Sequence, residues 1–247
     1  MLRCVAILTF ALSLAGCLGN RLEQGQIDLT YGSAAADLAP GIADRAQRAV
    51  RNIGEFWGEP YTRSVRINID PSERRSNTRI HDGFINLDLK SALPASNTIE
   101  HEITHVVVGS DPARRRYLIE GIAMYCEFRF GRYNATTPTA LTTYIDDWTR
   151  REIKKTGYMR LDRTDAVIAD PALAYPAWRT VAYTEAASFV KFLLEIYGLE
   201  KFKRIYRGYD FEPVYGKNLE HLEVEWLEKV FPDIGGRKLI ETMRASN

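Results

Sequence analysis

The chain is poor in cysteine and histidine, carries almost no net charge, and has no internal repeat or low-complexity segment. Its formal net charge of +1 argues against a nucleic-acid-binding protein, which would carry an excess of basic residues. Of its three cysteines, Cys4 and Cys17 lie in the N-terminal segment, and Cys126 lies alone in the rest of the chain. We therefore expect no internal disulfide, and the position of Cys126 in a helical pattern predicts a small core residue. The 247 residues suit one globular domain with a sizeable core.

The N-terminal segment lacks the length to span a membrane. Arg3 precedes a short apolar run over residues 5–14, and small residues follow, as is typical of a signal peptide. The sequence Leu14-Ala15-Gly16-Cys17 resembles the lipobox of bacterial lipoproteins, in which the cysteine becomes the acylated first residue. This resemblance implies a protein anchored in the bacterial cell envelope through lipidated Cys17. Leu18 stands in place of a retaining aspartate, and the same resemblance then implies the outer membrane of a Gram-negative host, facing the periplasm. An ordinary signal peptide or an uncleaved anchor is the alternative.

The remaining pattern predicts an α+β fold. We expect a signal peptide over residues 1–16, the lipidated cysteine and a flexible tether over 17–32, and a single domain over 33–247. Apolar residues alternate over 65–69 and 85–89, which predicts two strands of a small N-terminal sheet. Apolar residues at helical spacing predict helices, most of them in the C-terminal half, over 41–57, 97–108, from 118 onward, 141–153, 164–169, 180–197, 199–206 and 218–230.

The motif His101-Glu102-Ile103-Thr104-His105 indicates the chemistry. Residues four apart lie on the same face of a helix, so the two imidazoles can bind one metal ion from one side. Glu102 projects about 100° away from His101 and can border the site as a base that takes a proton from an activated water. This is the HExxH pattern of zinc metallopeptidases. Two helical histidines with polar partners and no metal are the simpler alternative.

The flanking residues predict that this motif lies on a short helix. Asn97 and Glu100 resemble a capping box, and Gly109 follows at the position of a C-terminal stop. Ile99 and Val106 supply part of a buried face, so the histidines have the phase that a metal site requires.

A catalytic zinc site usually has three protein ligands and one open position. Glu120 is the favoured third ligand because it begins a second apolar helix, where a buried carboxylate needs a partner. Gly121 beside it allows a neighbouring backbone to come close. The rival is Asp111, which takes the place of the third ligand in the longer HExxHxxGxxH pattern. Val108 stands where that pattern has glycine, and Pro112 favours a turn.

The HEITH motif, followed by a helix with the sequence LIEGIAMYCE, resembles the gluzincin clan of zinc peptidases, and more narrowly its small peptidase MA-like families. The resemblance covers about residues 41–230, and the HExxH and Glu-Gly-x-Ala pieces are its specific parts. It implies a zincin-like fold, a Zn²⁺ cofactor and a peptide or protein substrate. It also implies that His101, His105 and Glu120 are the zinc ligands and that Glu102 is the catalytic base.

Four further features are candidates for the same site. Gluzincins use a downstream tyrosine or histidine to donate a hydrogen bond to the oxyanion, which makes Tyr183 a candidate, with a core tyrosine as the equal alternative. Glu127 can orient a ligand histidine or can simply be exposed. The resemblance implies that strand 85–89 borders the cleft and pairs with extended substrate, whereas the alternative is an interior strand. Arg114-Arg115-Arg116 can meet an acidic substrate or form a solvated loop.

The sequence therefore predicts zinc-dependent hydrolysis of peptide bonds in the cell envelope. The alternative, from a different class, is a lipid-anchored binding or scaffold module whose zinc is structural or whose site is inactive. A structural zinc has four protein ligands. An intact Glu102 argues for catalysis, because a binding module does not need that carboxylate.

Overall fold

The computed structural model describes residues 19–70, 76–79, 82–93, 96–109, 115–131, 138–170, 176–233, 235 and 238, with side chains from residue 144 onward in the helix that begins at 138. The predicted signal peptide, Cys17 and Asp111 lie outside the described residues. None of the helices in the described part of the chain has the length and apolar character needed to cross a bilayer.

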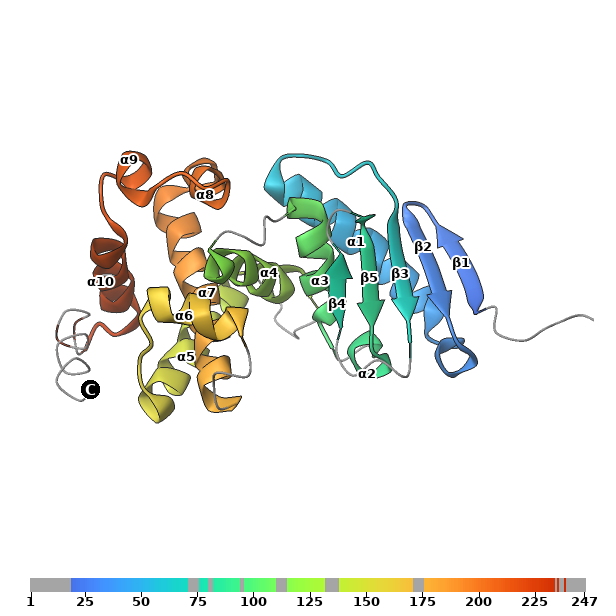
Figure 1. The fold of residues 1–247 in the computed structure, drawn as a ribbon, viewed down its shortest axis with the longest axis horizontal. Coiled ribbons are helices and arrows are strands. Elements are labelled where there is room, and N and C mark those ends of the chain that lie inside the picture. The colour runs from blue at the N-terminus through green and yellow to red at the C-terminus, as the bar shows by residue number, and fades with distance from the viewer. Residues whose placement is uncertain are drawn as a thin grey trace, which may run out of the picture.

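A five-stranded sheet forms the N-terminal part of the molecule (Figure 1). Its strands are β1 (Asn20–Gln24), β2 (Ile27–Tyr31), β3 (Val65–Ile69), β4 (Asn77–Arg79) and β5 (Phe84–Leu87). Their order across the sheet is β1-β2-β3-β5-β4. The three central strands run parallel, and β1 and β4 are antiparallel edge strands. Alternate apolar side chains of the central strands are buried, as the period of two predicts.

The prediction of a flexible tether is wrong for residues 20–31, because they form β1 and β2. Ile27 and Leu29 are buried and pair in register with Val65 and Ile67 of β3. The alternation of apolar and polar residues in β2 is short. The strand is stabilised by pairing with β3, which is distant in the chain, so the local sequence did not reveal it.

The strand predicted over 85–89 is β5, and it lies inside the sheet between β3 and β4. The edge is formed instead by β4, which has no apolar residue and was not predicted. The expectation that strand 85–89 borders the cleft is therefore wrong, and the simpler alternative of an interior strand is correct.

Helices make up the rest of the described chain, which confirms the α+β class and the mostly helical C-terminal half. After a 3-10 turn, η1 (Ser33–Ala35), the helices are α1 (Ala39–Trp57), α2 (Leu89–Ala92), α3 (Thr98–Val108), α4 (Arg116–Phe130), α5 (Pro138–Thr156), α6 (Leu161–Ala169), α7 (Pro176–Tyr197), α8 (Leu199–Tyr206), α9 (Phe211–Tyr215) and α10 (Leu219–Val230). The short helices α2 and α9 were not predicted.

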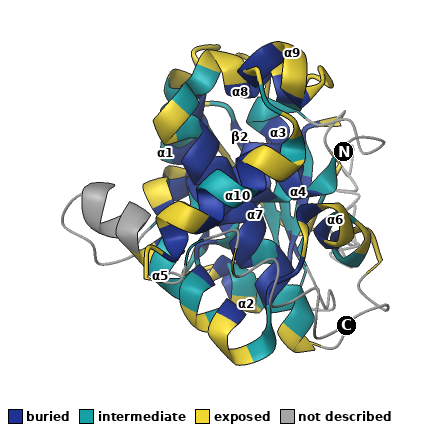
Figure 2. Ribbon diagram, turned by 90° about the vertical axis from the view of Figure 1, so that its left-hand side faces the viewer, coloured by how far each residue is buried: buried dark blue, intermediate teal, exposed yellow. Residues whose placement is uncertain are grey.

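The elements form two halves joined by α4. Helices α1 and α3 contact each other and pack on the sheet, α1 against β1 and β2 and α3 against β4 and β5. In the helical half, α7 is the central element and contacts α4, α5, α6, α8 and α10. Figure 1 shows α4 between the sheet half and the helical half, and Figure 2 shows buried residues along α1 and α7. Cys126 of α4 is a fully buried core residue, as predicted.

Candidate metal centre

The motif lies on α3, whose buried face includes Ile99 and Val106 as predicted. The predicted capping box does not form, because Asn97 makes no side-chain cap. Glu100 turns instead to Arg45 of α1, and the two side chains form a buried ion pair with two hydrogen bonds. This contact fixes the motif helix to α1 through residues 55 positions apart, which a local pattern does not reveal.

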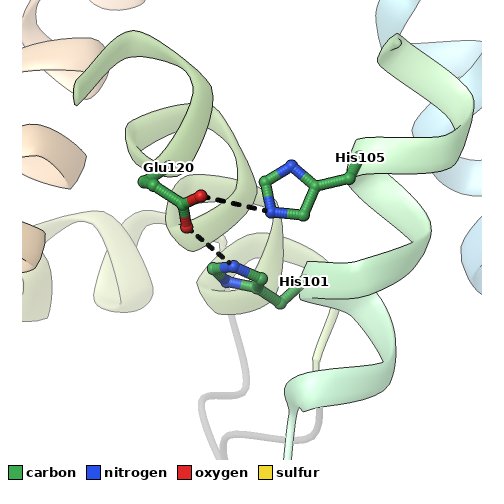
Figure 3. A group of neighbouring side chains, drawn as sticks. All are labelled: His101, His105 and Glu120. Atoms are coloured by element: carbon green, nitrogen blue, oxygen red, sulfur yellow. Dashed lines mark hydrogen bonds and ion pairs between the residues drawn. The ribbon is translucent and has the colours of Figure 1, made fainter. Parts of the chain in front are cut away.

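Two histidines of α3 and one glutamate of α4 converge on a single point (Figure 3). His101 Nε2 lies 3.2 Å from Glu120 Oε2, and His105 Nε2 lies 3.7 Å from Glu120 Oε1. One potential ligand atom from each of the three residues lies within 4.8 Å of the other two. The structure therefore brings together the three residues that the sequence assigned as metal ligands.

Glu127 lies behind this cluster and faces the other nitrogen of the first histidine. His101 Nδ1 is 3.2 Å from Glu127 Oε2, and the Glu127 side chain is largely buried, so the alternative of an exposed glutamate is excluded. A neutral His101 with its proton on Nδ1 donates to Glu127 and leaves the Nε2 lone pair directed at the cluster. This is how a carboxylate commonly orients a metal-binding histidine.

The electrostatics of the cluster favour a cation. Burial alone lowers the pKa of His101, but the hydrogen bonds and charges of Glu120 and Glu127 raise it well above its ordinary value. Burial lowers the pKa of His105. Burial raises the pKa of Glu120, yet the two imidazoles outweigh it and hold that pKa at about 2. Neutral imidazole and ionised carboxylate are the forms that bind a metal, and the carboxylates around His101 favour positive charge there.

The donor set fits Zn²⁺. Imidazole nitrogen and carboxylate oxygen are ordinary zinc ligands, and two ligands of one zinc ion lie at most about 4 Å apart. The observed spacing needs only a small adjustment to reach that geometry. Three ligands leave a tetrahedral ion one open position, which is the arrangement of catalytic rather than structural sites.

Glu102 lies beside the cluster and is held from the sheet. Its side chain is buried, and the hydroxyl of Thr78 on β4 donates a hydrogen bond to Glu102 Oε2. The edge strand thus contacts the residue predicted as the base. Thr78 could not be predicted from the sequence, because β4 carries no periodic signal and the contact joins residues 24 positions apart.

A cleft of about 310 Å³ opens over the cluster. Tyr183 of α7 lines it, so the structure places the fifth predicted side chain at the same site. Burial, together with the charge of Glu120, raises the pKa of Tyr183 to about 12, so its hydroxyl stays protonated at neutral pH. The residues that line the cleft come from β4 and its approach, α3, α4 and α7: Ser76, Asn77, Thr78, His101, Glu102, His105, Arg116, Ile119, Glu120 and Tyr183.

Close packing of α4 on α7 sets the position of Glu120 relative to Tyr183. A Cβ atom added at Gly121 would lie 2.5 Å from the carbonyl oxygen of Ala186, so only glycine allows this approach. The expectation that Gly121 admits a neighbouring backbone is confirmed.

Comparison with known proteins adds no relative: no protein-family model matches this chain, and no curated protein matches it.

Proposed function

We propose that this protein is a zinc-dependent peptidase with a zincin-like fold and a gluzincin type of ligand set. The observation that carries the proposal is the convergence of His101, His105 and Glu120 beside a buried Glu102 in one cleft. The open fourth position expected for three ligands supports catalysis over a scaffold module whose zinc is purely structural.

Zn²⁺ bound by these residues would polarise a substrate carbonyl and lower the pKa of a bound water toward about 7. Glu102 then accepts the proton of the attacking water and delivers it to the leaving amine. Thr78 holds one oxygen of the Glu102 carboxylate, which leaves the other oxygen for the proton.

Two further side chains act in this mechanism. Tyr183 keeps its phenolic proton and donates a hydrogen bond to the carbonyl oxygen as that oxygen gains negative charge. Glu127 holds the ring of His101 in one orientation.

We further propose that the protein meets its peptide or protein substrates in the bacterial cell envelope, held on the outer membrane by lipidated Cys17. The lipobox-like sequence that ends at Cys17 supports this location. Mass spectrometry of the protein isolated from cells tests it, since diacylation or triacylation adds a defined mass to the cysteine. Protein isolated from cells that carries no acyl group on Cys17 and does not remain with the membrane fraction contradicts this location.

The proposed activity is tested with purified protein prepared without chelators. We expect about one zinc per chain by elemental analysis and cleavage of a labelled unfolded protein, which a chelator abolishes and added zinc restores. Glu102→Gln should keep the zinc and lose activity by at least about 10³-fold, because that change removes only the base. A metal-free wild-type protein, or a Glu102→Gln variant with full activity, refutes the proposal. Bound zinc without any cleavage favours the scaffold module.

A further inference from the structure

One guanidinium group at the cleft has no partner in the described part of the protein. Arg116 lines the cleft with Ile119 and Glu120 and is only partly exposed. Within the described residues, its side chain makes no hydrogen bond, ion pair or ring contact. Its charge nevertheless reaches the cluster, because it contributes to the lowered pKa of Glu120.

The neighbouring Arg115, in contrast, makes contacts that stabilise the fold. Arg115 donates to the carbonyl oxygen of Tyr209 at 3.0 Å and to Asp210 at 3.1 Å, and its guanidinium lies 4.7 Å from the centre of the Phe211 ring. Arg115 thereby ties the start of α4 to the segment before α9. Arg116 makes no such contact, and a cation in the first turn opposes the helix dipole, so helix stability does not account for it.

The position of Arg116 relative to the metal ligands limits what it can contact. It lies four residues before Glu120, on the same face of α4 and about 6 Å away along the helix axis. An extended peptide advances about 3.3–3.6 Å per residue. A substrate group that meets Arg116 therefore lies one or two residues from the bond held over Glu120.

The charges around Arg116 indicate the chemistry of that group. Arg116 is the one arginine or lysine among the described residues that line the cleft, and the ligand set proposed for zinc lies one helical turn away from it. A guanidinium binds a carboxylate through two parallel hydrogen bonds and so recognises its shape as well as its charge. Ile119 next to it provides an apolar wall for the methylene groups of such a residue.

We propose that Arg116 selects substrates that carry a carboxylate one or two residues from the cleaved bond. This inference rests on the proposed peptidase function. The carboxylate belongs either to an aspartate or glutamate side chain or to the C-terminus of the substrate, and the experiment separates these two sources.

The test uses the zinc-loaded full chain and four peptides built around a bond that the wild-type protein cleaves. The peptides carry Asp or Asn at the position facing Arg116, each with a free or an amidated C-terminus. We expect wild type to cleave one acidic form about 10-fold to 100-fold better than its neutral match, as a charge-assisted pair implies. Preference for Asp identifies the side chain, and loss of preference on amidation identifies the C-terminus.

Variants of Arg116 separate selection from a structural role. Arg116→Gln should bring the ratio of kcat/KM for the acidic peptide to kcat/KM for its neutral match close to 1. Arg116→Lys should keep part of this preference, and Arg116→Glu should reverse it toward the neutral peptide. Arg163→Gln, an exposed arginine of α6, is the matched control and should leave the ratio unchanged. Equal loss on all peptides in Arg116→Gln, or an unchanged ratio, overturns the inference.

Direct binding distinguishes failure of this inference from failure of the proposed function. Fluorescence anisotropy measures the same peptides on Glu102→Gln protein, with and without Arg116→Gln, and needs no turnover. If the acidic peptide binds more tightly through Arg116 while its cleavage survives removal of the metal by a chelator, the selectivity stands and the zinc-peptidase proposal fails. If Arg116→Gln leaves peptide binding unchanged, the proposed selection by Arg116 is refuted, whether or not the protein is a peptidase.

Discussion

At the scale of single residues, Thr78 connects the edge of the sheet to Glu102, the carboxylate that we propose as the base. Its hydroxyl donates to Glu102 from β4, whereas His101 and His105 lie on α3 and face Glu120 of α4. A base that must accept and return a proton needs a fixed position, and one hydrogen bond from a rigid strand supplies part of that constraint.

Thr78→Val keeps the shape of the side chain and removes the hydrogen bond. We expect kcat to fall about 10-fold with zinc content unchanged, since a hydrogen bond to a charged group contributes about 1.5–3 kcal/mol and part of it is lost in the transition state. Steady-state kinetics with elemental analysis measures both quantities. The control is Thr30→Val on β2, which makes the same chemical change away from the cleft. Wild-type kcat in Thr78→Val would mean that other contacts position Glu102.

Helix periodicity is a local property, so the spacing of the HExxH motif was enough to predict that His101 and His105 share one face. Glu120 lies on the next helix and was assigned from its apolar surroundings and from the resemblance to the gluzincins. The partners from other elements could not be predicted. Thr78 meets Glu102 and Arg45 meets Glu100 only after the sheet and α1 have packed against α3.

At the scale of elements, the cleft depends on how closely α4 approaches α7. Gly121 follows Glu120 directly, and its Cα faces the backbone of Ala186. A methyl group at this point would also lie 2.6 Å from a side-chain carbon of Val190, so the two helices would have to separate.

Gly121→Ala should therefore lower the free energy of unfolding by about 1–3 kcal/mol, as overpacking in a core does, and should weaken zinc binding by displacing Glu120. Urea denaturation and competition with a chromophoric chelator measure the two effects. Gly41→Ala in α1 is the matched control, because nothing lies within 4 Å of the added methyl group. That change should be neutral or stabilising by up to about 1 kcal/mol. Equal effects of the two substitutions would show that the approach of α4 to α7 is not tight.

The long helices could be predicted because each carries an apolar stripe, and α1, α3, α7 and α10 begin and end within a few residues of the expected bounds. The strands β1, β2 and β4 could not. The first two lie in a stretch whose polar character suggested a tether, and Asn77–Arg79 is an edge strand that pairs, among the described strands, with β5 alone. Their structure comes from pairing with distant strands rather than from their own sequence.

At the scale of the whole molecule, the helical half is held together by two buried carboxylates that satisfy backbone groups. Glu185 of α7 accepts from the backbone N–H of Met159, and Glu223 of α10 accepts from that of Leu161 and from the hydroxyl of Tyr158. These bonds anchor the connection between α5 and α6 to α7 and α10, so the packing of this connection depends on the protonation of both acids.

Burial raises the pKa of Glu185 well above its ordinary value, and burial also raises the pKa of Glu223. In the unfolded chain both acids ionise near their usual pKa of about 4.3. Below that pH both states are protonated and the stabilising contribution is complete. As the pH rises toward the folded pKa, the unfolded chain loses its proton first, so stability falls by up to about 1.4 kcal/mol per pH unit for each group.

Glu185→Gln removes one of these titrations and keeps a side chain that can accept from Met159. We expect wild-type stability to decline relative to the variant as the pH rises from about 5 to 8, because glutamine does not ionise. Urea denaturation at several pH values measures the difference. Glu212→Gln, an exposed acid of α9, is the control and should follow wild type throughout. If the free energies of unfolding of wild type and Glu185→Gln changed in parallel with pH, Glu185 would be ionised in the folded protein. A buried cation would then be needed near Glu185 to balance its charge.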